Sequence, residues 1–180
     1  MNDLYANILN TPIGQLLALA NQDALCYLFF LDEEFNEELQ LKLEKKYNRK
    51  FQFKPHPILE KTAFEIAQYF SGELEEFSIL CHLTGSSFQK EVWESLCAIP
   101  YGITRNYKQQ ATSIGNPQAI RAMAKANGSN PIAIIVPCHR IIGSDGSLTG
   151  YAGGLWRKKY LLDLEASRNP AGKQFSLFDD

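Results

Sequence analysis

The sequence predicts an α+β protein: a small amino-terminal domain of antiparallel sheet and helices, followed by a mainly helical domain with a winged-helix-like helix-turn-helix. Three observations support this fold class. Short apolar runs separated by turn residues fill the first thirty positions, helical periodicity dominates the second half, and the balance of charge changes sign near residue 85. With 45% hydrophobic and 21% charged residues among 180, the composition is that of a globular protein.

Charge and composition suggest two domains and exclude a membrane protein. Residues 1–84 hold 7 basic against 13 acidic residues, whereas residues 85–168 hold 10 against 5. We expect domains over these two ranges and a tail over residues 169–180. The basic half suits a polyanionic partner, although scattered solvated charge would explain it as well. The longest apolar run, residues 24–31, is far shorter than the roughly 18 residues of a membrane span.

The first residues carry neither the basic segment nor the apolar segment of a secretory signal. We therefore expect a cytoplasmic, monomeric protein with no membrane partner. The four cysteines are far apart in the chain: Cys26, Cys81, Cys97 and Cys138. Without a C-x-x-C pair, and with three scattered histidines, we expect free thiols, no metal site and no cofactor.

The amino-terminal domain combines strand and helix patterns. Turn residues at 10–14 and 21–23 separate apolar runs, which predicts an antiparallel meander. Helical spacing over residues 39–47 and 59–70 predicts two helices that cover or flank the sheet. Residues 77–83 alternate apolar and polar side chains, so they form a last strand or an extended linker.

The second domain opens with three predicted helices. Ser86 and Gln89 have the spacing of a capping box and begin the first. A second helix over residues 107–113 and a third over 117–128 are joined by a glycine-containing turn, with Pro117 at the first position of the third. This is the layout of a helix-turn-helix.

The third helix carries a row of small side chains, Ala119, Ala122 and Ala126, with Arg121 beside it. One interpretation is that alanine favours helix and packs closely against a neighbour. In the other, the row lets the helix enter a narrow groove while Arg121 reaches the bases, as in proteins that bind the minor groove of DNA.

An apolar run at residues 132–136 predicts a buried strand that leads into Pro-Cys-His-Arg at 137–140. A cysteine after an apolar run is often an inert core residue, but imidazole and guanidinium neighbours favour a reactive thiol. Since neighbours in an extended chain point in opposite directions, His139 would reach Cys138 through a water molecule. Glu165, in a predicted terminal helix over residues 156–165, is a candidate to orient the imidazole, although spacing alone predicts a surface residue.

Two functions can be weighed on these residues. A Cys-His hydrolase would turn over repeatedly. A helix-turn-helix regulator that senses alkylation or oxidation through Cys138 would read bases in the major groove with polar side chains, of which the alanine row offers few.

Several motifs together resemble the O6-alkylguanine-DNA alkyltransferases of bacterial type. They are Asn-Pro-Ile-Ala-Ile-Ile-Val-Pro-Cys-His-Arg at 130–140, Tyr-Ala-Gly-Gly at 151–154, the helix-turn-helix with Arg121, and Glu165. The similarity is continuous from about residue 88 to residue 165. It implies a DNA repair protein that transfers alkyl groups irreversibly from O6 of guanine, and to some extent O4 of thymine, to its own cysteine, once per molecule and without a metal or cofactor.

The resemblance also implies roles for residues of the acceptor site. Cys138 would accept the alkyl group, His139 would pass the thiol proton through a water molecule, and Glu165 would hold the imidazole. Tyr107 would donate to N3 of guanine, and Asn130 would brace the turn that bears the cysteine.

The remaining residues would contact double-stranded DNA through its minor groove. Arg121 would fill the gap left by the extruded nucleotide, because an alkylated O6 inside the duplex must be flipped out to react. The other expected DNA-binding residues are Ala119, Ala122, Ala126 and Arg140. The expected base-pocket residues are Tyr151, Ala152 and Gly153.

The tail ends in a short motif behind a linker-like segment. Its residues Gln174, Ser176, Leu177 and Phe178 resemble the peptide by which bacterial repair proteins bind the sliding clamp. Disorder is the ordinary expectation for a terminus. The alternative is that the tail tethers the protein to the clamp.

Overall fold

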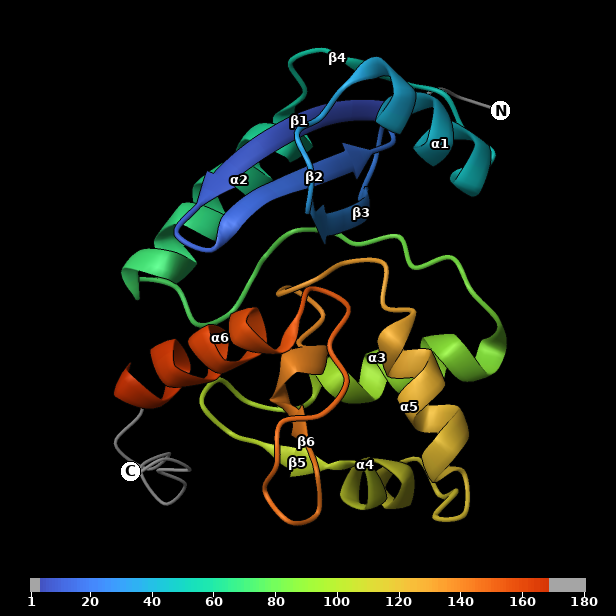
Figure 1. Ribbon diagram of the computed structural model, residues 1–180, viewed down its shortest axis with the longest axis vertical. Helices are drawn as coiled ribbons and strands as arrows, with labels where there is room; N and C mark the ends of the chain where they lie inside the picture. Colours follow the sequence, from blue (N-terminus) through green and yellow to red (C-terminus); the bar gives the residue numbers. More distant parts are fainter. Residues whose placement is uncertain (1–3, 169–180) are drawn as a thin grey trace. The chain divides into compact units, whose positions relative to one another are not determined.

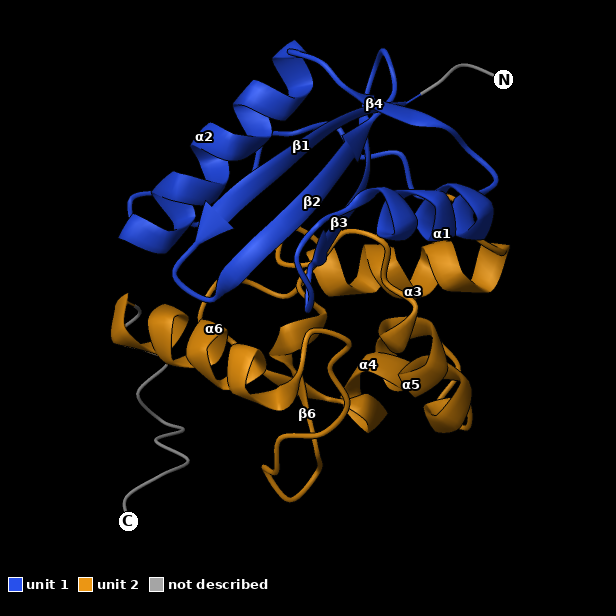
Figure 2. Ribbon diagram, turned by 45° about the horizontal axis from the view of Figure 1, so that its top comes forward, with its two compact units in different colours: residues 1–83 blue, residues 84–180 orange. Residues whose placement is uncertain are grey.

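The computed structural model describes residues 4–168 and divides into two compact units, residues 1–83 and residues 84–180 (Figure 2). Within residues 4–168, no helix combines the length and apolar character needed to cross a membrane. The α+β fold class predicted from the sequence is confirmed: strands and two helices form the first unit, and helices dominate the second (Figure 1).

The first unit is built on the predicted meander. Strands β1 (Leu4–Thr11), β2 (Gly14–Ala20) and β3 (Leu25–Phe30) pair antiparallel in sequence. A fourth strand, β4 (Phe51–Phe53), pairs parallel with β1 at the sheet edge. The antiparallel meander predicted for the first thirty residues is confirmed. Strand β4 was not predicted, because three residues are too few to show a period of two.

Two helices cover the sheet. Helix α1 (Glu37–Tyr47) begins at Asn36, whose side chain accepts from the backbone N–H of Leu39, and packs on the apolar cluster of one face. Helix α2 (Pro57–Ser71) lies along β1 and β2. Residues 16–20 of β2 are all buried, which requires cover on both faces of the sheet.

The segment predicted as a last strand or linker is extended and makes a single bridge, between Leu25 and Cys81. The N–H of Leu25 donates to the carbonyl of Leu80 at 2.9 Å, and the N–H of His82 donates to the carbonyl of Leu25 at 2.8 Å. The segment therefore adds two hydrogen bonds at the start of β3 rather than a further strand.

Short sequence patterns correctly predicted two helices of the second unit. Helix α3 (Ser87–Cys97) begins with the predicted capping box of Ser86 and Gln89. Helix α4 (Tyr107–Ser113) has the predicted bounds and its own capping box, formed by Asn106 and Gln109. In both boxes the side chains satisfy backbone N–H groups that the first helical turn leaves without partners.

Helix α5 (Ile120–Gly128) begins later than predicted. Pro117 lies in a turn closed by a hydrogen bond from the N–H of Ala119 to the carbonyl of Asn116 at 3.0 Å. The prediction that Pro117 is the first helical residue is therefore wrong, and Ala119 is the N-cap.

Side-chain hydrogen bonds fix α5 against the other two helices. The indole N–H of Trp93 in α3 donates to the carbonyl of Ala126 at 2.9 Å. The buried amides of Gln110 in α4 and Asn127 in α5 exchange two hydrogen bonds, of 3.2 and 2.7 Å. A buried amide without a hydrogen-bond partner is destabilising. These contacts therefore fix the position of α5 against α3 and α4.

The prediction of a strand at residues 132–136 is wrong. These residues form turns, with the N–H of Val136 bonded to the carbonyl of Ile132 at 3.1 Å and Ile134 in the left-handed region at φ 70°. They are followed by a 3-10 helix, η1 (Cys138–Arg140), and by β6 (Ile141–Ile142), which pairs parallel with β5 (Arg105–Asn106). The last element is α6 (Leu155–Arg168), and β6 lies between it and helices α3 and α5 (Figure 1).

Candidate functional site

Cys138 is the first residue of η1, and all three side chains of this short helix are buried. The sulfur-bearing side chain is 8% exposed. The N–H of Arg140 donates to the carbonyl of Pro137 at 3.0 Å, which closes the 3-10 turn. The cysteine therefore lies in a tight and well-packed segment rather than at the end of a strand.

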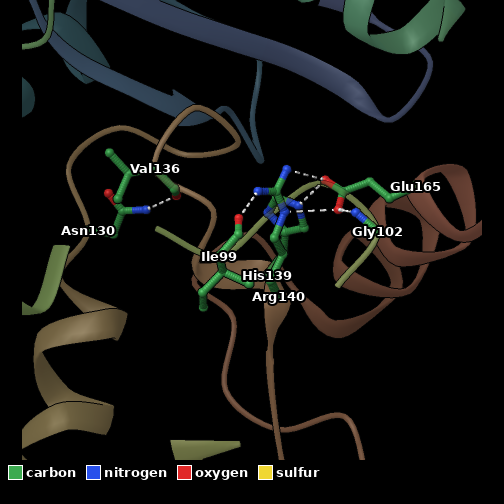
Figure 3. Close-up of polar contacts among 7 residues, drawn as sticks. All are labelled: Ile99, Gly102, Asn130, Val136, His139, Arg140 and Glu165. Carbon is green, nitrogen blue, oxygen red and sulfur yellow. Dashed lines mark hydrogen bonds and ion pairs between the residues drawn. The ribbon is translucent and has the colours of Figure 1, made fainter. Parts of the chain in front are cut away.

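Asn130 connects the preceding turn to the cysteine. Its Nδ2 donates to the carbonyl of Val136 at 2.7 Å (Figure 3). The same Nδ2 donates to Sγ of Cys138 at 3.2 Å, and Oδ1 accepts from the N–H of Ile132 at 3.0 Å. One amide thus satisfies groups at both ends of the turn and also contacts the sulfur.

Glu165 of α6 is fully buried and is the centre of a polar network (Figure 3). Its Oε1 lies 2.8 Å from Nε2 of His139. Nε and Nη2 of Arg140 donate to its two oxygens at 2.9 and 3.0 Å, and the N–H of Gly102 donates to Oε2 at 3.0 Å. Burial alone would raise the pKa of Glu165, but the hydrogen bond with His139 and the charge and hydrogen bonds of Arg140 hold it well below its ordinary value. The carboxylate is ionised.

This network determines the state of His139. An ionised carboxylate can only accept hydrogen bonds. Nε2 of the imidazole therefore carries the ring proton and donates the hydrogen bond to Glu165. Burial of the ring holds the pKa of His139 below its ordinary value, against the opposing effect of Glu165. The second nitrogen, Nδ1, is buried and has no hydrogen-bond partner among residues 4–168. The imidazole is therefore neutral, with Nδ1 available as a base.

The thiol of Cys138 is also neutral at rest. Burial raises its pKa, while the hydrogen bond from Asn130 and the charge of Lys158 act in the opposite direction. A neutral thiol and a neutral imidazole on adjacent residues can exchange a proton without creating an isolated charge elsewhere in the site.

Lys158 was not identified from the sequence. Its side chain is fully buried, and its ammonium donates to the carbonyls of Ile141 and, at 2.6 Å, of Thr149. Burial lowers its pKa to about 8. Lys158, Leu161 and Glu165 recur at i, i+3 and i+7, the spacing of a buried helix face, and that periodicity could have indicated it.

The loop after β6 holds the residues expected to shape a base pocket. The hydroxyl of Tyr151 is buried without a hydrogen-bond partner in the described part of the chain, and its ring lies edge-on to His139 with centroids 6.5 Å apart. Ala152 is exposed and Gly153 half-buried. Tyr107, the first residue of α4, reaches the same loop: a Cβ at Gly150 would lie 3.2 Å from its hydroxyl.

Only some of the residues expected to contact DNA are accessible at the surface. Arg121 and Ala122 are exposed on α5, and Ala119 is half-buried at its N-cap. The expectation is wrong for Ala126, which is 3% exposed because this side of the short helix packs on α3. It is also wrong for Arg140, whose guanidinium is buried, paired with Glu165 and bonded to the carbonyl of Ile99 at 2.6 Å.

The four cysteines have free thiols. Residues 4–168 contain no group of three or more His, Cys, Asp and Glu side chains that could hold a metal ion. The tail residues Gln174, Ser176, Leu177 and Phe178 lie outside the described residues.

Comparisons with known proteins agree with this site. Residues 87–167 match the family model of the DNA-binding domain of 6-O-methylguanine DNA methyltransferase. A methylated-DNA--protein-cysteine methyltransferase from Methanosarcina barkeri is 46% identical over 162 residues, which are 90% of this chain and 97% of that protein. A protein of the same name from Mycobacterium tuberculosis is 41% identical over 98% of this chain and 99% of its own length.

Solved structures are similar over almost the whole chain. The crystal structure of Mycobacterium tuberculosis O6-methylguanine methyltransferase superposes with a TM-score of 0.77 at 40% identity, covering 95% of this chain and 96% of that one. The structure of Mycobacterium tuberculosis OGT in complex with DNA gives a TM-score of 0.78 at 40% identity, covering 94% of this chain and 97% of the other.

The network around Glu165 predicts a large effect of Arg140→Met on stability. The substitution removes the guanidinium from a buried carboxylate and leaves the carbonyl of Ile99 without that donor. We expect the free energy of unfolding in urea to fall by about 3–5 kcal/mol. Lys159→Met, which breaks an exposed pair with Asp163, is the control and should change it little. Equal effects of the two substitutions would contradict the role given to the network.

Proposed function

The chain belongs to the methylated-DNA--protein-cysteine methyltransferases, and we propose that Cys138 is the cysteine on which it receives the alkyl group. It is a DNA repair enzyme that binds DNA and acts by alkyl transfer to protein. The observation that carries the assignment is the buried series Glu165, His139, Cys138, in which a neutral imidazole with a free Nδ1 is next to the thiol. Of the other three cysteines only Cys81 adjoins a histidine, and within residues 4–168 His82 makes no ion pair with a carboxylate.

The proposed reaction is a direct displacement at carbon. The thiol proton of Cys138 passes through a water molecule to Nδ1 of His139, and Glu165 stabilises the imidazolium that forms. Sγ then bonds to the alkyl carbon while the bond from that carbon to O6 of guanine breaks. The electron pair of the broken bond stays on the purine, which takes up a proton from water, and the imidazolium of His139 returns its proton to water. A hydrogen bond from the Tyr107 hydroxyl to N3 offsets the charge that develops there. O4-alkylthymine is the second substrate of the same displacement.

The substrate base must leave the duplex to reach the buried sulfur. We assign Arg121 to the gap that the flipped nucleotide leaves, because it is exposed on the first turn of α5. The small neighbours Ala119 and Ala122 suit close approach of the helix to the minor groove. Asn130 braces the turn before the cysteine, and Tyr151, Ala152 and Gly153 line the base pocket.

The product limits each molecule to one reaction. Transfer leaves a thioether on Cys138, and a thioether is not hydrolysed under mild conditions. The proposed mechanism needs neither a metal nor a cofactor, since the nucleophile, the base and the donor to the leaving purine are all side chains.

The tail supports a further proposal, from its sequence alone. We infer that Gln174, Ser176, Leu177 and Phe178 bind the bacterial sliding clamp and raise the local concentration of the enzyme on newly replicated DNA. Deletion of residues 174–180 should abolish clamp binding in a pull-down assay while alkyl transfer to free oligonucleotide stays intact. Clamp binding that survives the deletion would refute it.

Intact-mass analysis tests whether Cys138 is the residue that accepts the alkyl group. After incubation with duplex DNA that contains O6-methylguanine, the protein should gain one methyl group in place of one hydrogen, with a stoichiometry of one, and peptide mapping should locate it on Cys138. Cys138→Ala should gain nothing, whereas Cys97→Ala should react like the parent. Repeated turnover would favour a Cys-His hydrolase, and specific DNA binding without modification would favour a regulator.

A comparison of two substrates tests Arg121. Free O6-benzylguanine needs no flipping, so Arg121→Ala should slow repair of duplex DNA by at least about tenfold more than reaction with the free base, since flipping costs a few kcal/mol. Lys125→Ala removes the same charge from an exposed position of the same helix and should affect the duplex reaction less. Equal losses by Arg121→Ala on both substrates would exclude the role.

A further inference from the structure

The second half of β1 is an open sheet edge in the first unit. Strand β4 pairs only with Leu4, Tyr5 and Ala6, so within residues 4–168 no strand pairs with residues 7–11 on that side. On the other side the pairing of β1 with β2 is continuous up to the hairpin. Exposed edges usually carry a charged residue, a proline or a bulge that blocks another strand. The segment at 7–11, Asn-Ile-Leu-Asn-Thr, carries none of these.

The backbone groups of Ile8 and Asn10 point out of this edge. The two-residue hairpin makes Thr11 and Gly14 a hydrogen-bonded pair, and such pairs alternate with non-bonded pairs along antiparallel strands. The even-numbered residues of β1 therefore bond away from β2, and the N–H of Leu4 accordingly donates to the segment that leads into β4. Ile8 is half-buried and Asn10 is exposed. Their N–H and carbonyl groups are placed to pair with a further strand.

Helix α2 runs along the same edge and leaves a groove of about 500 Å³ beside it (Figure 2). The helix starts beside Tyr5, whose ring stacks on His56 with centroids 4.3 Å apart. Its last residue, Ser71, lines the groove together with Pro12 of the hairpin. Residues 7–10 of β1 form one wall, and no charged residue lines the groove in the described part of the chain. The other wall is formed by side chains of α2: Ala63, Ile66, Ala67 and Phe70.

An open edge beside an apolar groove fits an extended peptide better than a compact ligand. The backbone of such a peptide would pair with Ile8 and Asn10, in line with β4. Because side chains alternate along a strand, every second residue of the peptide would enter the groove, and the others would face solvent. Apolar residues at alternate positions are therefore the first requirement for the occupant.

Charge distinguishes among the possible occupants. Residues 1–84 hold 7 basic against 13 acidic residues. Directly after Ser71, at the end of the groove, the chain continues with the exposed side chains of Glu73, Glu75 and Glu76, and the carboxyl end of α2 adds negative potential there. This disfavours a second copy of the chain, which would bring two acidic units together. It also disfavours the chain's own carboxyl terminus, which ends in two aspartates. Charge complementarity favours a basic occupant.

We propose that the edge of β1 at residues 7–11 and the groove beside α2 bind an extended segment of a partner protein by strand addition. The segment alternates apolar residues with residues that include lysine or arginine. This docking site lies wholly within the first unit, so the inference does not rest on the proposed role of Cys138. It gives the first unit a role of its own, which is to join a DNA-binding enzyme to another protein.

Binding of a defined peptide to the full chain tests the site. The probe is fluorescein-labelled Lys-Val-Thr-Val-Lys-Val-Thr-Val-Lys, followed by fluorescence anisotropy. We expect saturable binding, and at least about tenfold weaker binding of the same peptide with glutamate in place of lysine. An absence of binding, or equal binding of the two peptides, would overturn the proposal.

Hydrogen exchange shows whether the peptide adds as a strand. On binding, the backbone N–H groups of Ile8 and Asn10 should become protected from exchange. The N–H groups of Asn7 and Leu9, which face β2, should change little. A peptide that binds without protecting Ile8 and Asn10 would contradict strand addition.

Two substitutions block the docking site in different ways. Asn10→Pro removes an N–H that faces the open edge and keeps the pairing with β2, so the lysine peptide should bind at least about tenfold more weakly. Ala67→Lys places a cation on the groove wall, should also weaken binding, and covers the case in which Asn10→Pro does not fold. Phe64→Lys adds the same charge at an exposed position of α2 outside the groove and is the matched control. Parent-like binding by folded Ala67→Lys would overturn the proposal.

Alkyl transfer to duplex DNA should be unchanged in Ala67→Lys, so this proposal and the assignment of Cys138 can fail separately. The other two occupants give distinct results. A dimer in sedimentation that Asn10→Pro dissociates would identify a second copy as the occupant. Displacement of the labelled probe by a peptide of residues 174–180 at a lower concentration than by unlabelled probe would identify the chain's own tail. Either result would overturn the proposal.

Discussion

The buried carboxylate of Glu165 is the interaction on which the rest of the site depends. It receives hydrogen bonds from two separate segments, through His139 and Arg140 of η1 and the N–H of Gly102, and it is itself part of a third, α6. A buried anion is destabilising unless its partners are all present, so the network forms only when these segments pack together. Folding of the second unit and assembly of the reactive site are thus one event.

The network also sets the chemistry, because it separates the roles of two basic side chains on adjacent residues. Arg140 neutralises Glu165, and its guanidinium is held by the carbonyl of Ile99 as well. His139 can therefore stay neutral in a dry environment and keep Nδ1 unprotonated. Had Arg140 been exposed, the imidazole would be the only cation available to the carboxylate, and a protonated ring could not accept the proton of Cys138.

Local signals predicted the elements that local interactions determine. The capping box of Ser86 and Gln89 and the meander of the first thirty residues involve neighbours in sequence, and both are present. The apolar run at residues 132–136 was misread because a buried turn and a buried strand have the same composition. The burial of Arg140 depends on contacts with the distant residues Glu165 and Ile99, which composition and short-range periodicity do not reveal. For Lys158 the only local signal was its helical spacing with Leu161 and Glu165. Glu165 could be offered from the sequence as a candidate to orient the imidazole, but spacing alone predicted a surface residue, and the family resemblance was needed to favour the buried role.

The site works only if His139 is a neutral base whose free nitrogen is Nδ1, and the protonation state of this ring can be measured directly. Two-dimensional proton–nitrogen NMR of the imidazole at pH 7 distinguishes the two neutral forms from the charged one. We expect a neutral ring with its proton on Nε2, hydrogen-bonded to Glu165, and an unprotonated Nδ1. A doubly protonated ring, or a neutral ring with its proton on Nδ1, would contradict it.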